Sequence, residues 1–121
     1  IRTATRTKAR LFSSMGAALK IDPTRIKVAE IWKVQGCPLA AALRRKMKQG
    51  EKPAKKFQCV YSDELLENKG FLYENDESKS SEVARQENPS VKASINGTLA
   101  HITAIFGFTL AGLVIKDICK E

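Results

Sequence analysis

The chain has 121 residues, a formal net charge of +8 and an aromatic content of 7%. A chain of this length holds one domain at most, which excludes a multidomain architecture. Its three cysteines are widely spaced and odd in number, which argues against a secreted disulfide framework and favours a reducing compartment. Because no CxxC pair occurs and His101 is the single histidine, we expect neither zinc nor another bound metal. The chain starts at Ile1 inside a basic run without a signal-peptide pattern, so we expect a fragment.

The charge divides the chain into three parts. Residues 1–56 hold 15 Lys and Arg against 3 Asp and Glu, residues 57–90 hold 3 against 8, and residues 91–121 hold 3 against 2. A basic half suits a phosphate-rich partner, although an ordinary solvated surface explains the charge equally well. We predict a basic strand–loop–strand–helix–strand part at 1–61, an acidic and mobile insertion at 62–90, and an apolar C-terminal helix at 91–121.

The first strand is predicted over Lys8–Ser14, and it ends in small residues that allow close backbone approach. Gly16 can take a positive φ there. In open α/β sheets a strand end is where backbone amides face a ligand, but a tight exit from a strand also needs small residues. Both interpretations remain open for this loop, which consists of Ser13, Ser14, Met15 and Gly16.

A turn and a second strand follow. Asp22 can bond its own backbone and Pro23 presets φ, which predicts a turn. Arg25–Trp32 then alternates in the manner of a strand, although its two faces are not cleanly separated. Asp22 and Arg25 either orient a substrate or form a turn cap beside an exposed arginine.

A basic helix and a third strand complete the first half. Pro38 suits the first turn of this helix, which we expect to end at Gly50. Its apolar residues at helical spacing are Leu39, Ala42, Leu43 and Met47. The third strand is predicted over Lys55–Tyr61. Cations in the last helical turns are favoured by the helix dipole, so they need no ligand. Phosphate contact is the alternative for the densest cationic stretch, which contains Arg44, Arg45, Lys46, Lys48, Lys52, Lys55 and Lys56.

The segment from Leu99 to Ile118 is almost continuously apolar, which makes it the strongest helix prediction. An apolar run of about 18 residues can cross a membrane, but this one contains His101, threonines and two glycines. We therefore expect a helix that is buried on most sides and pressed against a sheet through Gly107, Ala111 and Gly112. His101 is expected to be a hydrogen-bonded core histidine.

A resemblance to one protein family rests on the order and spacing of five segments, which are Ser13–Ala17, Asp22–Arg25, Cys37–Arg45, Val60–Ser62 and Phe106–Ile118. Together they resemble the carboxy-terminal half of that family's members. That family is the TcdA-type tRNA threonylcarbamoyladenosine dehydratases, in the E1-like superfamily with the MoeB and ThiF adenylating enzymes. The resemblance covers about two-thirds of the chain and omits the acidic segment. The missing CxxC zinc pairs of MoeB and ThiF favour the TcdA branch.

The resemblance implies an α/β fold in which short mixed strands and a long buried C-terminal helix complete a Rossmann-like sheet begun elsewhere. It implies a cytoplasmic, ATP-dependent enzyme that adenylates and cyclises the threonylcarbamoyl group of threonylcarbamoyladenosine in tRNA. No G-x-G-x-x-G occurs here, so we expect ATP and Mg²⁺ to be bound mainly by an amino-terminal half of the same protein. This chain alone would then be inactive, and the resemblance further implies a homodimer.

The resemblance also implies roles for residues. The loop of Ser13, Ser14, Met15 and Gly16, with Asp22 and Arg25, would lie beside the nucleotide and the substrate. Cys37 invites comparison with the thiol of ubiquitin-type E1 enzymes, because a helix start lowers a thiol pKa, although a capping role fits equally well. Cys59 and Cys119 are expected to be buried and inert. A tRNA substrate would be bound by Arg44, Arg45, Lys46, Lys48, Lys55 and Lys56.

Two alternative functions remain open from the sequence. The first keeps the superfamily but changes the substrate to a ubiquitin-like sulfur-carrier protein, whose C-terminal glycine is adenylated. The second is a non-enzymatic basic interaction module with a membrane-anchoring tail.

Overall fold

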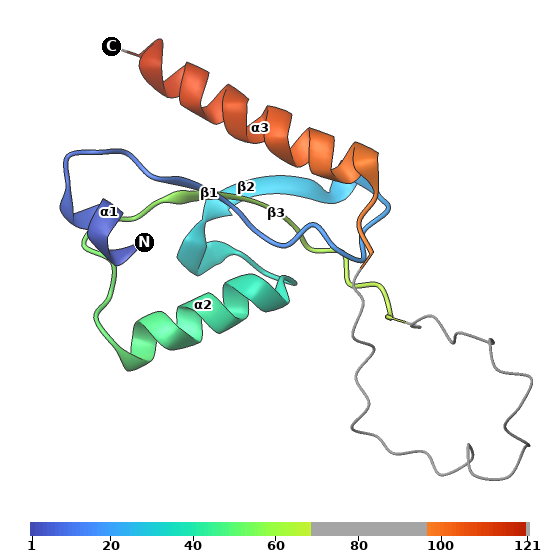
Figure 1. The fold of residues 1–121 in the computed structure, drawn as a ribbon, viewed down its shortest axis with the longest axis horizontal. Helices are drawn as coiled ribbons and strands as arrows, with labels where there is room; N and C mark the ends of the chain where they lie inside the picture. Colours follow the sequence, from blue (N-terminus) through green and yellow to red (C-terminus); the bar gives the residue numbers. More distant parts are fainter. Residues whose placement is uncertain (69–96, 121) are drawn as a thin grey trace, which may run out of the picture.

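Three short strands form one mixed sheet in the computed structural model, which describes residues 1–68 and 97–120 (Figure 1). The strand order is β1-β3-β2, so β3 is central and the other two strands are the edges. β1 runs parallel to β3, whereas β2 runs antiparallel to it. The strands are β1 (Phe12–Ser14), β2 (Ile26–Glu30) and β3 (Gln58–Ser62).

Two long helices cover the two faces of this sheet. α2 (Pro38–Gln49) lies below the sheet in Figure 1 and α3 (Ala100–Ile118) lies above it. The short α1 (Arg2–Arg6) forms the start of the chain. The three layers confirm the predicted α/β fold with short mixed strands.

The central strand β3 is buried on both faces. Cys59 and Tyr61 belong to the apolar cluster on the α2 side, whereas Val60 belongs to the cluster on the α3 side. The alternation of Phe57, Cys59 and Tyr61 in the sequence therefore marks one face of this strand correctly. A strand that is apolar on both faces is removed from solvent when a layer of helices covers each face.

The predicted second strand is shortened at both ends by 3₁₀ turns. Pro23–Arg25 forms η1 and Ile31–Lys33 forms η2, so β2 keeps only the five residues between them. Ile31 is fully buried, and its backbone N–H donates to the Phe57 carbonyl oxygen at 3.2 Å. η2 thus turns the chain into the core instead of continuing along the sheet edge.

α2 begins at Pro38 and is capped at Gly50, as the sequence predicts. Its buried residues are Ala40 and Met47, with Leu43 packed partly against the same cluster. Leu39, which falls at the same helical spacing, is exposed.

α3 is not buried on most sides, which corrects the sequence prediction. Ile102 and Phe106 are buried against Val60, and Leu110 and Leu113 pack partly beside them. The opposite side is open to solvent, and Phe108 is 78% exposed. A Cβ atom added at Gly107 or Gly112 would meet nothing within 4 Å, so these glycines do not bring α3 close to the sheet. The contact uses the larger apolar side chains.

Polar contacts fix both ends of α3 to the sheet layer. The His101 Nε2 atom lies 2.9 Å from the Ile21 carbonyl oxygen, and Asp117 accepts a hydrogen bond from Arg10. His101 is thus hydrogen-bonded as expected, but it is exposed and not in the core. By length and composition α3 is the one helix of the described residues that is able to cross a membrane, which is weak evidence taken alone. In this structure α3 packs on the sheet through Ile102 and Phe106.

The first residues of the predicted acidic insertion contact the folded layers. Ser62 ends β3, and Asp63 accepts hydrogen bonds from Arg25 of η1 and Lys27 of β2. The rest of the acidic stretch that we expect to be mobile, residues 69–90, lies outside the described residues.

Asp63 should make stability depend on pH in a narrow acidic range. Its pKa is lowered from 3.8 to about 2, first by the hydrogen bond from Lys27 and then by that from Arg25. Because the folded pKa lies below the unfolded one, its contribution is complete above 3.8 and is lost as the pH falls toward about 2. The difference in unfolding free energy between the native chain and Asp63→Asn should therefore be constant near neutral pH and shrink over that range.

Urea denaturation at a series of pH values measures this difference. Glu51→Gln, which removes only an exposed ion pair with Arg6, is the matched control, and its effect should stay within about 1 kcal/mol. A difference for Asp63→Asn that does not change below 3.8 would contradict the assignment.

Candidate functional site

A crevice of about 340 Å³ opens where β1 and β3 end and α2 begins. Its walls include Gly16 and Lys20 after β1, Cys37 and Leu39 at the start of α2, and Glu64 after β3. In open α/β sheets, the carboxyl ends of parallel strands are where ligands bind, because the loops diverge there. The crevice is therefore the first candidate site.

Only one residue of the predicted loop lines this crevice. Ser13 and Ser14 belong to β1 itself, and Met15 is buried with its N–H donating to the Val60 carbonyl oxygen at 2.9 Å. Gly16 does line the crevice, but it does not have a positive φ. The residue with a left-handed backbone is Leu19, which follows this loop and has a φ of 57°. The turn that shapes the crevice wall thus lies three positions after Gly16.

A buried pair of charged residues stabilises that turn. Lys20 and Glu64 are only 4% and 7% exposed, and the Lys20 ammonium donates to the Glu64 carbonyl oxygen at 2.6 Å. The Glu64 carboxylate accepts the backbone N–H groups of Ile21 and Asp22 at 2.8 and 3.0 Å. Sequence analysis missed both residues, because nothing in their spacing signals a contact across 44 positions. Lys20 is the cation that the structure places at the crevice wall.

Asp22 and Arg25 lie outside the crevice lining. Asp22 caps η1, since its Oδ1 atom accepts the Thr24 N–H at 2.8 Å, and the hydrogen bonds from Thr24 lower its pKa. The Arg25 Nε atom donates to Asp63 Oδ1 at 2.9 Å, and this hydrogen bond raises the pKa of the guanidinium. The geometry therefore matches the turn-cap interpretation for Asp22, while Arg25 links η1 to the end of β3.

The three cysteines have different surroundings. Cys37 precedes α2 as its N-cap residue but makes no capping hydrogen bond, and it is buried at the crevice wall. Cys59 is fully buried, and this burial raises its thiol pKa to about 11, with the nearby Cys37 as a smaller cause. Cys119 is exposed, so the expectation that it is buried was wrong. A nucleophilic role for Cys37 stays a prediction.

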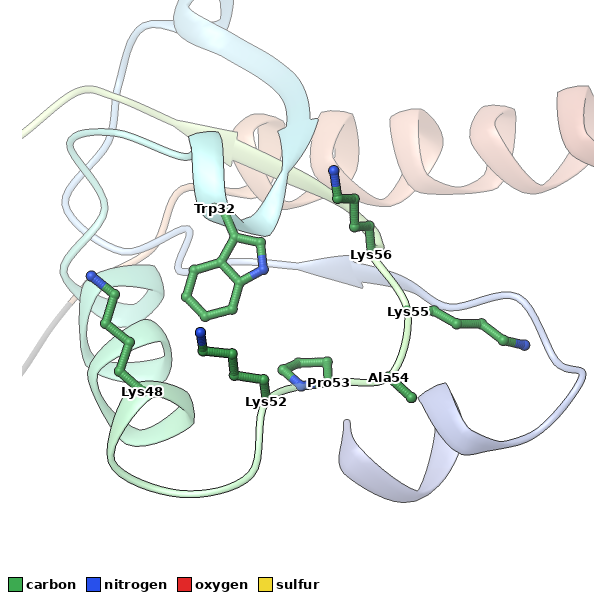
Figure 2. A pocket seen from close by; sticks show the side chains of 7 residues that line it. All are labelled: Trp32, Lys48, Lys52, Pro53, Ala54, Lys55 and Lys56. Atoms are coloured by element: carbon green, nitrogen blue, oxygen red, sulfur yellow. The ribbon is translucent and has the colours of Figure 1, made fainter.

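The cationic residues separate into two groups. Arg44 is partly buried, and its guanidinium donates to the carbonyl oxygens of Ile31 and Val34 at 3.1 and 2.6 Å. It thus fixes η2 to α2, whereas Arg45 and Lys46 are exposed on the helix surface. The remaining lysines surround a second pocket of about 570 Å³ beside Trp32 (Figure 2). This pocket is lined by Trp32, Lys48, Lys52, Pro53, Ala54, Lys55 and Lys56.

Trp32 is the aromatic residue that sequence analysis did not assign to a site. It is the single tryptophan of the chain and is followed directly by Lys33, but it was counted as the end of a strand. Among the described residues, no group of three or more His, Cys, Asp or Glu side chains converges in a way that could hold a metal ion.

The mixed sheet between two helices, with a crevice at its strand ends, is the arrangement that the resemblance to an E1-like α/β domain implies. The chain is 35% identical over 113 residues to the tRNA threonylcarbamoyladenosine dehydratase of Bacillus subtilis (strain 168), covering 92% of this chain and 41% of that protein. It is 32% identical to the Escherichia coli (strain K12) protein of the same name, covering 96% of this chain and 45% of the relative. No protein-family model matches the chain.

Solved structures give the same result. The crystal structure of E. coli TcdA, the tRNA N6-threonylcarbamoyladenosine dehydratase, aligns with a TM-score of 0.69 at 26% identity over 98% of this chain and 42% of that one. The TcdA complex with ATP aligns with a TM-score of 0.68 over 99% of this chain. These matches confirm the TcdA-like resemblance. The chain spans about two-fifths of the length of the curated relatives that it matches, which is consistent with a carboxy-terminal half.

Two glycines should respond differently to the same substitution. Gly36 has a φ of +64°, and an added Cβ would lie 2.7 Å from the Asp63 carbonyl oxygen. Gly36→Ala should therefore lower the unfolding free energy by about 1–3 kcal/mol through backbone strain alone. At Gly16 the added Cβ would lie 3.8 Å from the Leu39 Cβ, an ordinary contact, so Gly16→Ala should change stability by less than about 0.5 kcal/mol.

Urea unfolding monitored by circular dichroism compares the two variants. Equal losses would show that the close approach of Gly36 to the end of β3 does not constrain this loop.

Proposed function

We propose that this chain is the carboxy-terminal part of an ATP-dependent enzyme that cyclises threonylcarbamoyladenosine in tRNA. The observation that carries the proposal is the alignment of almost the whole chain with TcdA, including a TcdA complex with AMP at a TM-score of 0.66 and 26% identity. The two curated relatives are both named tRNA threonylcarbamoyladenosine dehydratase. Their names favour this function over sulfur-carrier adenylation and over a non-enzymatic membrane-anchored module.

The chemistry explains why ATP would be needed. A carboxylate is a poor electrophile, because its oxygen is a poor leaving group. In the proposed reaction the threonylcarbamoyl carboxylate attacks the α-phosphate of ATP and releases pyrophosphate. Ring closure on the activated carbonyl then expels AMP, so the tRNA loses one water overall. Charge that develops on the phosphate would be stabilised by cations and backbone N–H groups.

This chain would contribute part of such a site. Gly16 lies in the crevice wall after β1, and Lys20 fixes that wall because its buried ammonium donates to the Glu64 carbonyl oxygen. The sequence offers no glycine-rich phosphate loop for a whole nucleotide. We therefore propose that ATP and Mg²⁺ are held mainly by polypeptide outside this chain, and that the chain alone is inactive.

That additional polypeptide would also complete the packing. β1 is a sheet edge in the described residues, and the outer side of α3 exposes the apolar residues Phe108, Ile115 and Ile118. More than half of each curated relative lies outside the matched region, which supplies the length needed to cover both surfaces. We propose that the amino-terminal part of the same protein covers them. Homodimerisation and a cytoplasmic location stay predictions of the resemblance.

Phe108→Glu tests the proposed cover on α3. In the 121-residue chain the side chain is 78% exposed, so the substitution should change the unfolding free energy by less than about 0.5 kcal/mol. In the protein at its natural length it should cost about 2 kcal/mol or more, because a charge would be buried in an apolar contact. Phe108→Leu is the apolar control, and equal effects of Phe108→Glu in both forms would contradict the proposal.

The proposed reaction predicts an ATP-dependent change in tRNA. Incubation of threonylcarbamoyladenosine-containing tRNA with the protein at its natural length, ATP and Mg²⁺ should yield a nucleoside lighter by one water, together with AMP and pyrophosphate. Mass spectrometry of the digested tRNA measures this product. ATP–pyrophosphate exchange that depends on a ubiquitin-like carrier and ignores tRNA would identify the alternative function.

Two variants refine this assay. Cys37→Ser tests the thiol, since a nucleophilic role requires that activity be abolished while the fold is retained. Cys119→Ser is the matched control, because Cys119 is exposed and lies at the end of α3.

A further inference from the structure

The pocket beside Trp32 lies at the opposite end of α2 from the crevice. Lys48 belongs to the last turn of α2, and Lys52, Lys55 and Lys56 lie on the segment that leads into β3. Figure 2 shows the Trp32 indole on one wall with the Lys48 and Lys52 side chains beside it, while the Lys55 side chain extends away from the ring. Segments that are distant in sequence thus bring one aromatic ring and several lysines together.

The positive charge of this pocket is poorly neutralised. No acidic side chain lines it, and within residues 1–68 and 97–120 neither Lys48 nor Lys52 has an ion-pair partner. Lys56 lies 3.8 Å from the Glu30 carboxylate, and Lys55 donates to a backbone carbonyl, which leaves its charge in place. Glu51, on the same loop, is paired with Arg6 instead. An anion would therefore be attracted to this pocket.

Trp32 adds a second and different recognition element. It packs partly against the apolar cluster of the α2 side, so its position is fixed, while part of the ring borders the pocket. The volume of about 570 Å³ is in the range of small-ligand sites. An aromatic face combined with backbone-tracking cations is how proteins bind unpaired nucleotides, because every base has a π-face and every linkage has a phosphate.

We propose that the Trp32 pocket binds an unpaired nucleotide of an RNA strand. The base stacks on the indole, and Lys48, Lys52 and Lys56 contact the flanking phosphates. The identity of the RNA as tRNA rests on the proposed function, but the stacking interaction itself does not. The pocket adds Trp32 to the cationic stretch that the sequence predicts to contact phosphate. It excludes Arg44 and Lys55, whose charged groups already donate to backbone carbonyl oxygens.

The single tryptophan gives a direct measurement of this contact. Titration of the 121-residue chain with a short unstructured single-stranded RNA should quench Trp32 fluorescence, because the stacked base contacts the only indole. Inorganic polyphosphate at equal charge should bind without comparable quenching. Absence of quenching by RNA, or equal quenching by polyphosphate, would overturn the proposal.

Variants separate stacking from charge. Anisotropy of labelled RNA should show about tenfold weaker binding for Trp32→Ala and a change below about threefold for Trp32→Phe, which keeps an aromatic face and protects the fold. Lys48→Glu and Lys52→Glu should weaken binding and reduce its salt dependence, whereas Lys116→Glu on α3 is the matched control. Unchanged affinity in Trp32→Ala and in both lysine variants would overturn the proposal.

The two proposals fail in distinguishable ways. If the protein at its natural length cyclises tRNA while the Trp32 and lysine variants bind RNA like the native protein, the pocket assignment is wrong and the proposed function stands. If RNA quenches Trp32 but no cyclised nucleoside forms, the pocket assignment stands and the proposed function is wrong.

Discussion

Burial of β3 on both of its faces is the constraint on which the rest of the structure depends. Val60 faces α3, while Cys59 and Tyr61 face α2, and each is almost completely removed from solvent. A strand in this position needs a helix on each side and a hydrogen-bonded neighbour along each edge. α2, α3, β1 and β2 satisfy these four requirements. Both candidate binding regions are built from the segments that enter and leave this one strand.

Polar residues at the end of the buried strand β3 stabilise the fold through hydrogen bonds. Ser62 is still completely buried, and its Oγ atom accepts the Glu64 N–H at 3.2 Å. Asp63 binds Arg25 and Lys27, and Glu64 binds the turn that contains Lys20. Acidic residues that look like the beginning of a solvated segment in the sequence therefore hold the two loops around the crevice. Their role follows from where β3 ends and not from local composition.

Local signals in the sequence predicted the helices and strands well. Contacts between residues far apart in the sequence were predicted poorly. Pro38 and Gly50 mark the limits of α2, because proline and glycine act on the backbone of their own residue. The partners of Arg44 and Glu64 lie on other elements, so their structural roles required the tertiary fold. The apolar run in α3 predicted a helix but not which sides would be covered, since it lacks a polar stripe that fixes the orientation. Trp32 looked like part of a strand because it ends an alternating segment, and its place in the pocket required the tertiary fold.

The relation between the two binding regions follows from α2. The crevice contains the first residues of this helix, and the Trp32 pocket contains Lys48 near its last residue. A helix of 12 residues is about 18 Å long, so one nucleotide is too short to occupy both regions. The helix dipole places partial positive charge at the crevice end, and the lysines neutralise the partial negative charge at the other end. Both ends of α2 therefore attract anions, and a ligand that reached both ends would have to be longer than one nucleotide. A base stacked on Trp32 would therefore not be the group that enters the crevice.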